Sequence, residues 1–277
     1  MTTPTPAPAL AGPRSDRPAG TPRPPAGRTV TRGRLWQPTY VRVELRRLLR
    51  NRRTVIFTLV MPPVFFLLFG TAGDYRDQVA GHGNVTAYVM VSMAVYGAIL
   101  ATTGGGAGVS VERAQGWSRQ LRLTPLRPSA YVLTKVAVAM VLGLASIVVT
   151  YAVGLASGAD LPVSALLATA GLAWLGSSVF AAFGLFMGYL LPAENVMQVL
   201  GPVLALLAFA GGLFTPITGG VFATIAKFIP TYGLAEIVRA PLTGEGVTVW
   251  AVLNVVVWGA VFVGGAAWRF RLDTARV

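Results

Sequence analysis

The sequence predicts an all-α integral membrane protein with six transmembrane helices. Hydrophobic residues make up 54% of the 277 residues, charged residues only 12%, and the mean hydropathy is +0.62. A soluble domain carries about 25% charged residues, so this chain has too few to cover a surface that faces water. Six apolar stretches approach the roughly 20 residues that a helix needs to cross a bilayer: 54–71, 86–109, 130–156, 163–190, 196–215 and 246–268.

These stretches leave room for one transmembrane domain, 35–277, after an N-terminal tail, 1–34. The tail is rich in Pro, Gly, Thr and Arg, lacks periodicity, and is predicted to be disordered. No apolar segment follows its arginines as it would in a signal peptide. Pro62-Pro63 predict a kink or tilt in the first span. The glycine run at 104–106 predicts close helix packing or a flexible span end.

The charged residues predict the orientation of the chain. With six spans, the side that holds both termini carries 20 basic and five acidic residues, whereas the other side carries three basic and five acidic ones. The positive-inside rule then places both termini in the cytoplasm and the spans in the cytoplasmic (inner) membrane. Because the basic residues serve this orientation, the net charge of +13 does not indicate a nucleic-acid partner.

Residue types that carry catalytic or energy-coupling chemistry are scarce. The chain has no Cys, and neither of its lysines is followed by the Ser or Thr of a phosphate-binding loop, so we expect no metal, cofactor or nucleotide site on it. The single histidine, His82, falls in a short external loop, and a lone histidine there is expected to be solvated rather than catalytic. No Asp or Glu lies well inside a span, and Glu194 sits in a turn where interfacial water can solvate it. A transporter driven from outside its spans fits this pattern better than an ion-coupled transporter.

The segment 38–53 is predicted to form a basic amphipathic helix on the cytoplasmic membrane surface, leading into the first span. Its apolar face holds Val41, Leu45, Leu48 and Leu49. The candidate interface residues on it are Arg42, Glu44, Arg46 and Arg50. An interface for a partner and a simple membrane anchor are both compatible with this pattern.

The loop 110–129 is longer than a connection between two spans requires. Its sequence predicts a short helix from Glu112 towards Arg122, which stops at Thr124-Pro125 because the residue before a proline avoids the helical region. About five residues would join the spans, yet this loop carries a helix, Trp117 and four arginines. A docking surface explains the excess, and a solvated basic loop is the alternative.

The segment 211–241 is apolar but broken by glycines and prolines, and neither half is long enough to span. A re-entrant or interfacial helical hairpin on the outer face is therefore predicted. Glu236 and Arg239 are three residues apart on one helix face and are expected to pair. Both a structural plug and a gate for substrate exit fit this segment.

Over residues 38 to 268 the sequence resembles the permease subunits of ABC-2 type exporters, a family of bacterial drug, antibiotic and polysaccharide efflux permeases. The family's E-R-x-x-G-x-x-x-x-L-R-x-T-P loop is matched by Glu112, Gly116, Leu121, Arg122, Thr124 and Pro125, followed by Tyr131 and Lys135. Its pattern before the last span is matched by Gly211, Gly212, Pro216, Pro230, Thr231, Tyr232, Glu236 and Arg239. Gly219-Gly220 stands where many relatives have a further proline, so the hairpin tip is expected to be built differently.

The resemblance implies a dimer, formed with a second copy or a paralogue, in which each permease docks an ABC ATP-binding subunit that holds ATP and Mg. A coupling helix between spans two and three and the 38–53 helix would contact that subunit. The docking residues would be Glu112, Arg113, Gly116, Trp117, Leu121, Arg122, Thr124 and Pro125. Closure of the ATPase pair would reorient the spans around a pathway formed by spans two and five.

The substrate that this resemblance favours is a hydrophobic or amphipathic small molecule, such as an antibiotic or another drug. The apolar spans do not separate this from export of a lipid-linked glycan or another lipid. From other classes, a non-transporting membrane scaffold would not need so large a basic loop. An intramembrane enzyme would need convergent Ser, His, Asp or metal ligands, which the sequence does not offer.

Overall fold

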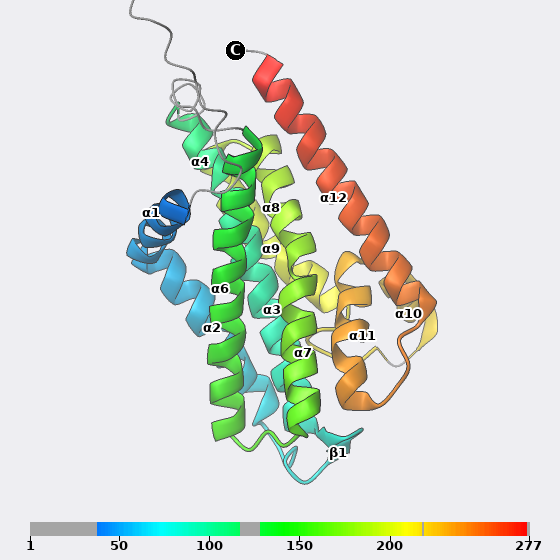
Figure 1. The fold of residues 1–277 in the computed structure, drawn as a ribbon. Coiled ribbons are helices and arrows are strands. Elements are labelled where there is room, and N and C mark those ends of the chain that lie inside the picture. The colour runs from blue at the N-terminus through cyan, green and yellow to red at the C-terminus, as the bar shows by residue number, and fades with distance from the viewer. Residues whose placement is uncertain (1–37, 117–127, 218, 276–277) are drawn as a thin grey trace, which may run out of the picture. The chain divides into compact units, whose positions relative to one another are not determined.

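The computed structural model describes residues 38–116, 128–217 and 219–275, most of which are helical (Figure 1). The first half of the chain forms α1 (Pro38–Arg50), α2 (Arg52–Gly70), the two-residue strands β1 (Val79–Ala80) and β2 (Gly83–Asn84), α3 (Val85–Ala107), α4 (Val109–Ala114) and α6 (Pro128–Ala156). The second half forms α7 (Val163–Gly176), α8 (Ser178–Leu190), α9 (Ala193–Ala210), α10 (Gly220–Ala226), α11 (Pro230–Thr243) and α12 (Val249–Ala275). The two strands pair antiparallel, Val79 with Asn84 and Ala80 with Gly83.

Five of the described helical segments are long and apolar enough to cross a membrane, and they correspond to predicted spans two to six: Val85–Ala114, Ser129–Ala156, Val163–Leu190, Ala193–Ala210 and Val249–Leu272. Two bent pairs raise the number to as many as seven. One pair joins α1 to α2, the predicted first span, at 66°, and the other joins α10 to α11 at 93°. The all-α membrane architecture is therefore confirmed.

The two ends of the helices differ in what they carry. We call the end with α1, α4, the first turns of α6 and α9 and the last turns of α12 the basic end (Figure 1). The opposite end, with the β1–β2 strands, the α6–α7 loop and residues 211–248, is the hairpin end. The cavities and polar clusters described below lie at one end or the other.

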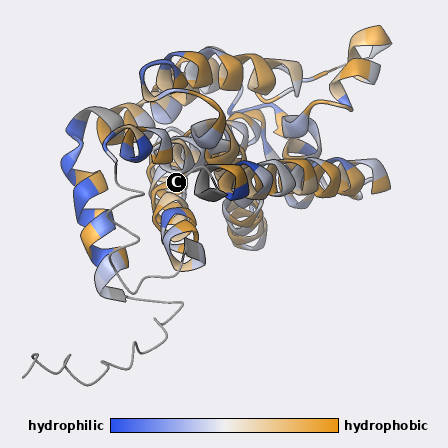
Figure 2. Ribbon diagram, turned by 90° about the horizontal axis from the view of Figure 1, so that it is seen from above, coloured by the Kyte–Doolittle hydropathy of each residue, from blue (hydrophilic) through white to orange (hydrophobic). Residues whose placement is uncertain are grey.

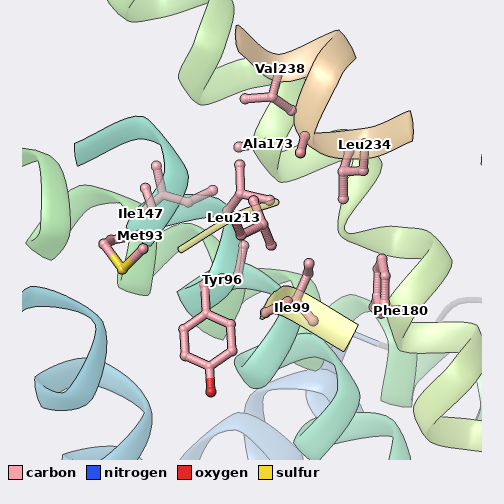
Figure 3. Packing of buried hydrophobic residues seen from close by; sticks show 14 of the residues in the cluster. Met93, Tyr96, Ile99, Ile147, Ala173, Phe180, Leu213, Leu234 and Val238 are labelled. Atoms are coloured by element: carbon pink, nitrogen blue, oxygen red, sulfur yellow. The ribbon is translucent and has the colours of Figure 1, made fainter. Parts of the chain in front are cut away.

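Helix α3 occupies the centre of the described helices. Of its apolar window 78% is buried, and it packs against α2, α6, α8, α9 and α11. Figure 3 shows the core around its Met93, Tyr96 and Ile99, with Phe180, Leu213 and Leu234 contributed by other elements.

Small residues let the main chains of α3 and its neighbours approach closely. A Cβ on Gly105 would meet Ala139 of α6, a Cβ on Gly106 would meet the Ala181 carbonyl of α8, and a Cβ on Gly184 would overlap the Thr103 carbonyl of α3. Apolar packing of this kind replaces the hydrophobic effect between helices in lipid. The close packing predicted for the 104–106 run is confirmed at Gly105 and Gly106.

Helix α2 runs through Pro62 and Pro63 without ending. Proline at 62 removes the amide that would donate to the Thr58 carbonyl one turn earlier. Ser146 of α6 donates its hydroxyl to that carbonyl at 3.3 Å, so the freed acceptor has a partner in a buried position. Gly97 of α3 makes room for the Pro62 ring, since a Cβ there would lie 2.7 Å from Pro62 Cγ.

The helices are largely hydrophobic along their length, as Figure 2 shows. Only 22% of the apolar window of α9 and 17% of that of α12 is buried within the chain. Large side chains such as Leu206 and Phe209 of α9 and Val256 of α12 are more than half exposed. Such a surface is stable when lipid or another apolar protein face covers it.

The tight α3–α8 contact makes Gly184→Ala destabilising. The added methyl group would overlap the main chain of Thr103, and the resulting strain should cost about 1–3 kcal/mol. Thermal unfolding of the detergent-purified chain, followed by tryptophan fluorescence, measures the effect. Gly171→Ala is the matched control, because Gly171 is also helical and a Cβ there meets nothing within 4 Å. Equal melting temperatures for the two variants would contradict the packing.

Candidate functional site

Charged side chains from three elements meet at the basic end. Glu44 and Arg47 come from α1, Glu112 from α4, and Tyr131 and Lys135 from the first two turns of α6. We call these five residues the ionic cluster. Four of them are buried to between 3% and 6% exposure, and only Arg47 reaches outward, with 47% of its side chain exposed.

The contacts within the ionic cluster form a closed network. Lys135 Nζ bridges one oxygen of Glu44 and one oxygen of Glu112. Arg47 Nη1 lies 2.7 Å from Glu112 Oε1 and 3.7 Å from Glu44 Oε2. Tyr131 donates its hydroxyl to the second Glu112 oxygen, Oε2. Each carboxylate therefore contacts both cations.

This pairing is what makes the burial of the charges tolerable. Moving a carboxylate or ammonium out of water costs several kcal/mol, and the attraction of a partner offsets that cost only when geometry is good and the remaining polar atoms are bonded. Two carboxylates and two cations balance in the cluster. A displacement of α1 or α4 away from α6 would leave a buried charge without its partner, so the cluster fixes the three elements relative to one another.

The surface position expected for Glu112 was wrong. Its side chain is 3% exposed and contacts Arg47, Tyr131 and Lys135. The reason is local: α4 follows α3 after only Gly108 and turns Glu112 towards α6. Glu112 therefore positions α4 against α1 and α6.

The rest of the predicted coupling helix is only partly described. Helix α4 begins at Val109 and ends at Ala114, and Gly116 has a φ of +72°. The predicted helix that runs without a break from Glu112 through Gly116 was therefore wrong. Arg113 donates to the carbonyls of Gly188 and Tyr189 at 3.3 and 3.1 Å, which ties α4 to α8. The predicted docking residues Trp117, Leu121, Arg122, Thr124 and Pro125 lie outside the described residues.

The predicted amphipathic helix is α1. Its Arg42, Arg46 and Arg50 are exposed, as an interface would require, whereas Glu44 is buried in the ionic cluster. The sequence analysis did not identify Arg47, Tyr131 and Lys135 as members of one site. The available signal was Lys135, a cation inside an apolar stretch that needs a buried partner.

At the hairpin end, the predicted helical hairpin corresponds to α10 and α11. The carbonyls at their bend receive hydrogen bonds from α12 side chains. Asn254 Nδ2 donates to Lys227 at 2.8 Å and to Ile229 at 3.1 Å, and Trp258 Nε1 donates to Phe228 at 2.9 Å. Because lipid offers no donors, irregular backbone at membrane depth requires such partners from the protein.

The motif residues before the bend and after it pack against one another. Pro230 occupies the first turn of α11, and the Thr231 hydroxyl donates to the Leu207 carbonyl of α9. A Cβ on Gly211 would overlap that hydroxyl, and Gly212 has a φ of +77°, so both positions favour glycine.

The expected pair between Glu236 and Arg239 was wrong. Arg239 Nη2 donates to Ser92 Oγ at 2.7 Å and to the Gly212 carbonyl at 2.8 Å, and its guanidinium carbon lies 4.5 Å from the centre of the Tyr88 ring. Glu236 accepts from the Thr248 amide at 3.1 Å. Helical spacing put the two residues on one face, but partners on α3 and the 211–213 turn surround the guanidinium.

A cavity of about 550 Å³ opens between α2, α3 and α9 towards the basic end. It is lined by Phe57 and Thr58, by Leu100, Thr103 and Gly104, and by α9 residues within 194–204. We call it the inner cavity. Its lining is mainly apolar, and the acidic residue on its described wall is Glu194.

A second cavity, of about 450 Å³, lies at the hairpin end and is called the outer cavity. It is lined by Tyr88 of α3, by the 211–217 turn and by residues of α11 that include Tyr232, Glu236 and Arg239. The predicted hairpin residues Gly211, Gly212 and Pro216 all lie on its wall.

Four aromatic rings pack against one another between the level of the inner cavity and the level of the outer cavity. Tyr96 of α3 lies 5.0 Å from Phe214 and 6.1 Å from Phe65 of α2, centre to centre, and Phe69 lies 5.9 Å from Phe214. Along α3, Tyr96 comes between Tyr88 of the outer cavity and Leu100 of the inner cavity. The aromatic cluster of Phe65, Phe69, Tyr96 and Phe214 is therefore centred on the buried Tyr96, between the two cavities, with Phe69 half exposed at its edge.

Comparison with known proteins gives two similarities. Residues 39–243 match the sequence model of the family described as "ABC-2 type transporter". The chain is also similar to a protein of Bacillus subtilis (strain 168) named "Putative transport permease YvfS", with 28% identity over 207 residues, which is 71% of this chain and 82% of that protein. The residues matched by the family model include the whole ionic cluster.

The two lysines of the chain provide a test of the ionic cluster. Lys135→Met should destabilise the purified chain by about 3–5 kcal/mol, because it leaves two buried carboxylates with Arg47 alone. Lys227→Met is the matched control, since Lys227 is exposed and its backbone contacts do not involve the ammonium. Thermal unfolding in detergent measures both.

Adding Glu44→Gln to Lys135→Met should recover part of the lost stability, because it removes one of the uncompensated charges. If the two lysine variants melted at the same temperature, the ionic cluster would not hold the three elements together.

Proposed function

Because the chain belongs to the ABC-2 type transporter family, we propose that it is the membrane permease subunit of an ATP-driven exporter whose ATP and Mg are held by a separate ABC subunit. The ionic cluster is the observation that carries this proposal. It joins α1, α4 and α6 at the basic end, where an ATPase that docks on the permease would have to transmit its motion.

The cytoplasmic side is the basic end in this proposal. The positive-inside rule supports it, since 20 of the 23 basic residues fall on the side of the two termini. The protein then lies in the cytoplasmic membrane with both termini inside. The exposed Arg42, Arg46 and Arg50 of α1 form the docking surface together with the predicted docking residues from Gly116 to Pro125, of which those after Gly116 lie outside the described residues.

Energy coupling is mechanical in this arrangement. The chain contains no Gly-Lys-Ser/Thr sequence with which to hold nucleotide phosphates. Closure of the docked ATPases displaces α1 and the 112–125 segment. The ionic cluster carries that displacement to α6, and Arg113 carries it to α8. Helix α3 packs tightly against both α6 and α8 and moves with them.

The substrate is a hydrophobic or amphipathic small molecule. The inner cavity has the size of a typical small-molecule site, about 300–1,000 Å³, and its lining is mainly apolar. Helices α3 and α9, which contribute most of that lining, are predicted spans two and five. The outer cavity is the exit, and the aromatic cluster between the two levels closes the route in this state.

A second permease, either another copy of the chain or a paralogue, completes the pathway. Helix α9 exposes Met197 on the wall of the inner cavity, and Leu206 and Phe209 further along the helix. A partner permease that packs on this apolar face would close the open side of the cavity and shield the substrate from lipid.

Co-purification tests this function. The tagged chain is co-expressed with the ABC ATPase encoded beside its gene and purified from detergent-solubilised membranes. The wild type should retain the ATPase. The Arg46→Glu, Arg50→Glu double variant should lose at least about tenfold of it, because reversing two exposed charges turns attraction into repulsion across the docking surface.

Lys227→Glu is the control for charge reversal, because Lys227 lies at the hairpin end and is also exposed. It should retain the ATPase at the wild-type level. Absence of the ATPase from the wild-type preparation would make a non-transporting scaffold the better description of the chain.

A further inference from the structure

We propose that the inner cavity binds an organic cation with an apolar body, and that Glu194 is the counter-ion of its positive charge. The inference rests on the proposed function in treating this cavity as the substrate site, and it adds the charge of the substrate. It comes from the distribution of charge along the two cavities and the aromatic cluster between them.

Glu194 is available to a ligand. It lies in the first turn of α9, is exposed and lines the inner cavity. It forms no ion pair with any of the described residues, in contrast to Glu44 and Glu112, whose carboxylates are saturated by the ionic cluster. Its position in the first turn of α9 also places its carboxylate beside the free amides of that helix end.

The described wall of the inner cavity offers no cationic side chain to an anionic ligand. Among the described residues on its wall there is no Lys, Arg or His, and the other polar side chains are Thr58, Thr103 and Gln198. On the side of the cavity the apolar wall excludes water, so there the field of the carboxylate is screened less than in bulk water. A molecule with a positive group near Glu194 and an apolar body against Phe57 and Leu204 is therefore favoured over an anion of the same shape.

The same preference continues towards the hairpin end. The faces of the four rings in the aromatic cluster attract cations rather than anions. The outer cavity has the carboxylates of Glu236 and Glu245 on its wall and a single guanidinium, that of Arg239. That guanidinium is already held by Ser92, the Gly212 carbonyl and the Tyr88 ring. The described walls thus carry a net negative charge at both levels.

Two probes of equal shape and opposite charge test the inference: tetraphenylphosphonium and tetraphenylborate. Their binding to the purified full-length chain is measured by equilibrium dialysis, with protein-free detergent micelles as the background. The wild type should bind the cation more tightly than the anion by at least about tenfold. Glu194→Gln should weaken binding of the cation by about tenfold and leave binding of the anion unchanged or stronger, since only the charge is removed.

Asp160→Asn is the matched control, because Asp160 is also an exposed carboxylate but lines neither described cavity. It should bind both probes as the wild type does, and Glu194→Asp should retain most of the cation affinity. Tighter or equal binding of tetraphenylborate by the wild type would overturn the inference, as would unchanged cation binding by Glu194→Gln.

These outcomes are separate from those of the co-purification test. A chain that retains its ATPase but prefers tetraphenylborate remains an exporter permease, with a substrate of another charge. A chain that binds tetraphenylphosphonium through Glu194 but retains no ATPase has the cation site without the proposed energy source.

Discussion

A lipid environment offers no donors and no acceptors, and this constraint accounts for the side-chain hydrogen bonds to interrupted helical backbone in the described chain. Two interruptions of the helical backbone are matched by side chains from a neighbouring helix. Ser146 donates to the carbonyl that Pro62 leaves free, and Asn254 and Trp258 donate to the carbonyls at the bend between α10 and α11. The irregular segments are thereby held as firmly as the helices. This allows two prolines and a sharp bend at positions where the sequence is otherwise apolar.

The sequence was sufficient for the helices that cross the membrane because hydrophobic length alone determines them, and predicted spans two to six each correspond to one apolar helix or helix pair. It also located the broken segment around Gly211 and Pro230. It could not supply the partners of the buried polar groups, since these lie far apart in the chain. Glu112 reads as a loop residue because its neighbours in sequence are polar, yet its neighbours in space are Tyr131, Lys135 and Arg47. Arg239 fails in the same way: helical spacing offered Glu236, but Ser92, 147 residues away, is its partner.

The two acidic residues of the ionic cluster and Glu194 illustrate why burial and pairing, rather than residue type, separate structural from functional charges. Glu44 and Glu112 are almost fully buried, and each contacts both Lys135 and Arg47. Their charges therefore hold α1, α4 and α6 together. Glu194 belongs to the same end of the chain but stands on a cavity wall without such a partner among the described residues. An unpaired carboxylate beside an apolar surface is a position where a cationic ligand gains energy by pairing with it.

The ionic cluster also has a property that apolar packing would lack. A buried ion pair adds little net stability compared with well-packed hydrophobic residues, but separating its members leaves charges uncompensated and is strongly unfavourable. An interface of this kind resists sliding, because each oxygen and nitrogen has one position that satisfies it, whereas apolar side chains repack at small cost. In the proposed function the substrate route lies within α2, α3 and α9 and the energy enters at α1 and α4, so a rigid connection between these parts would have a direct use. A displacement at the basic end would be passed to α6 as a whole, and through the close contacts of α6 and α8 to α3, rather than being absorbed by local repacking.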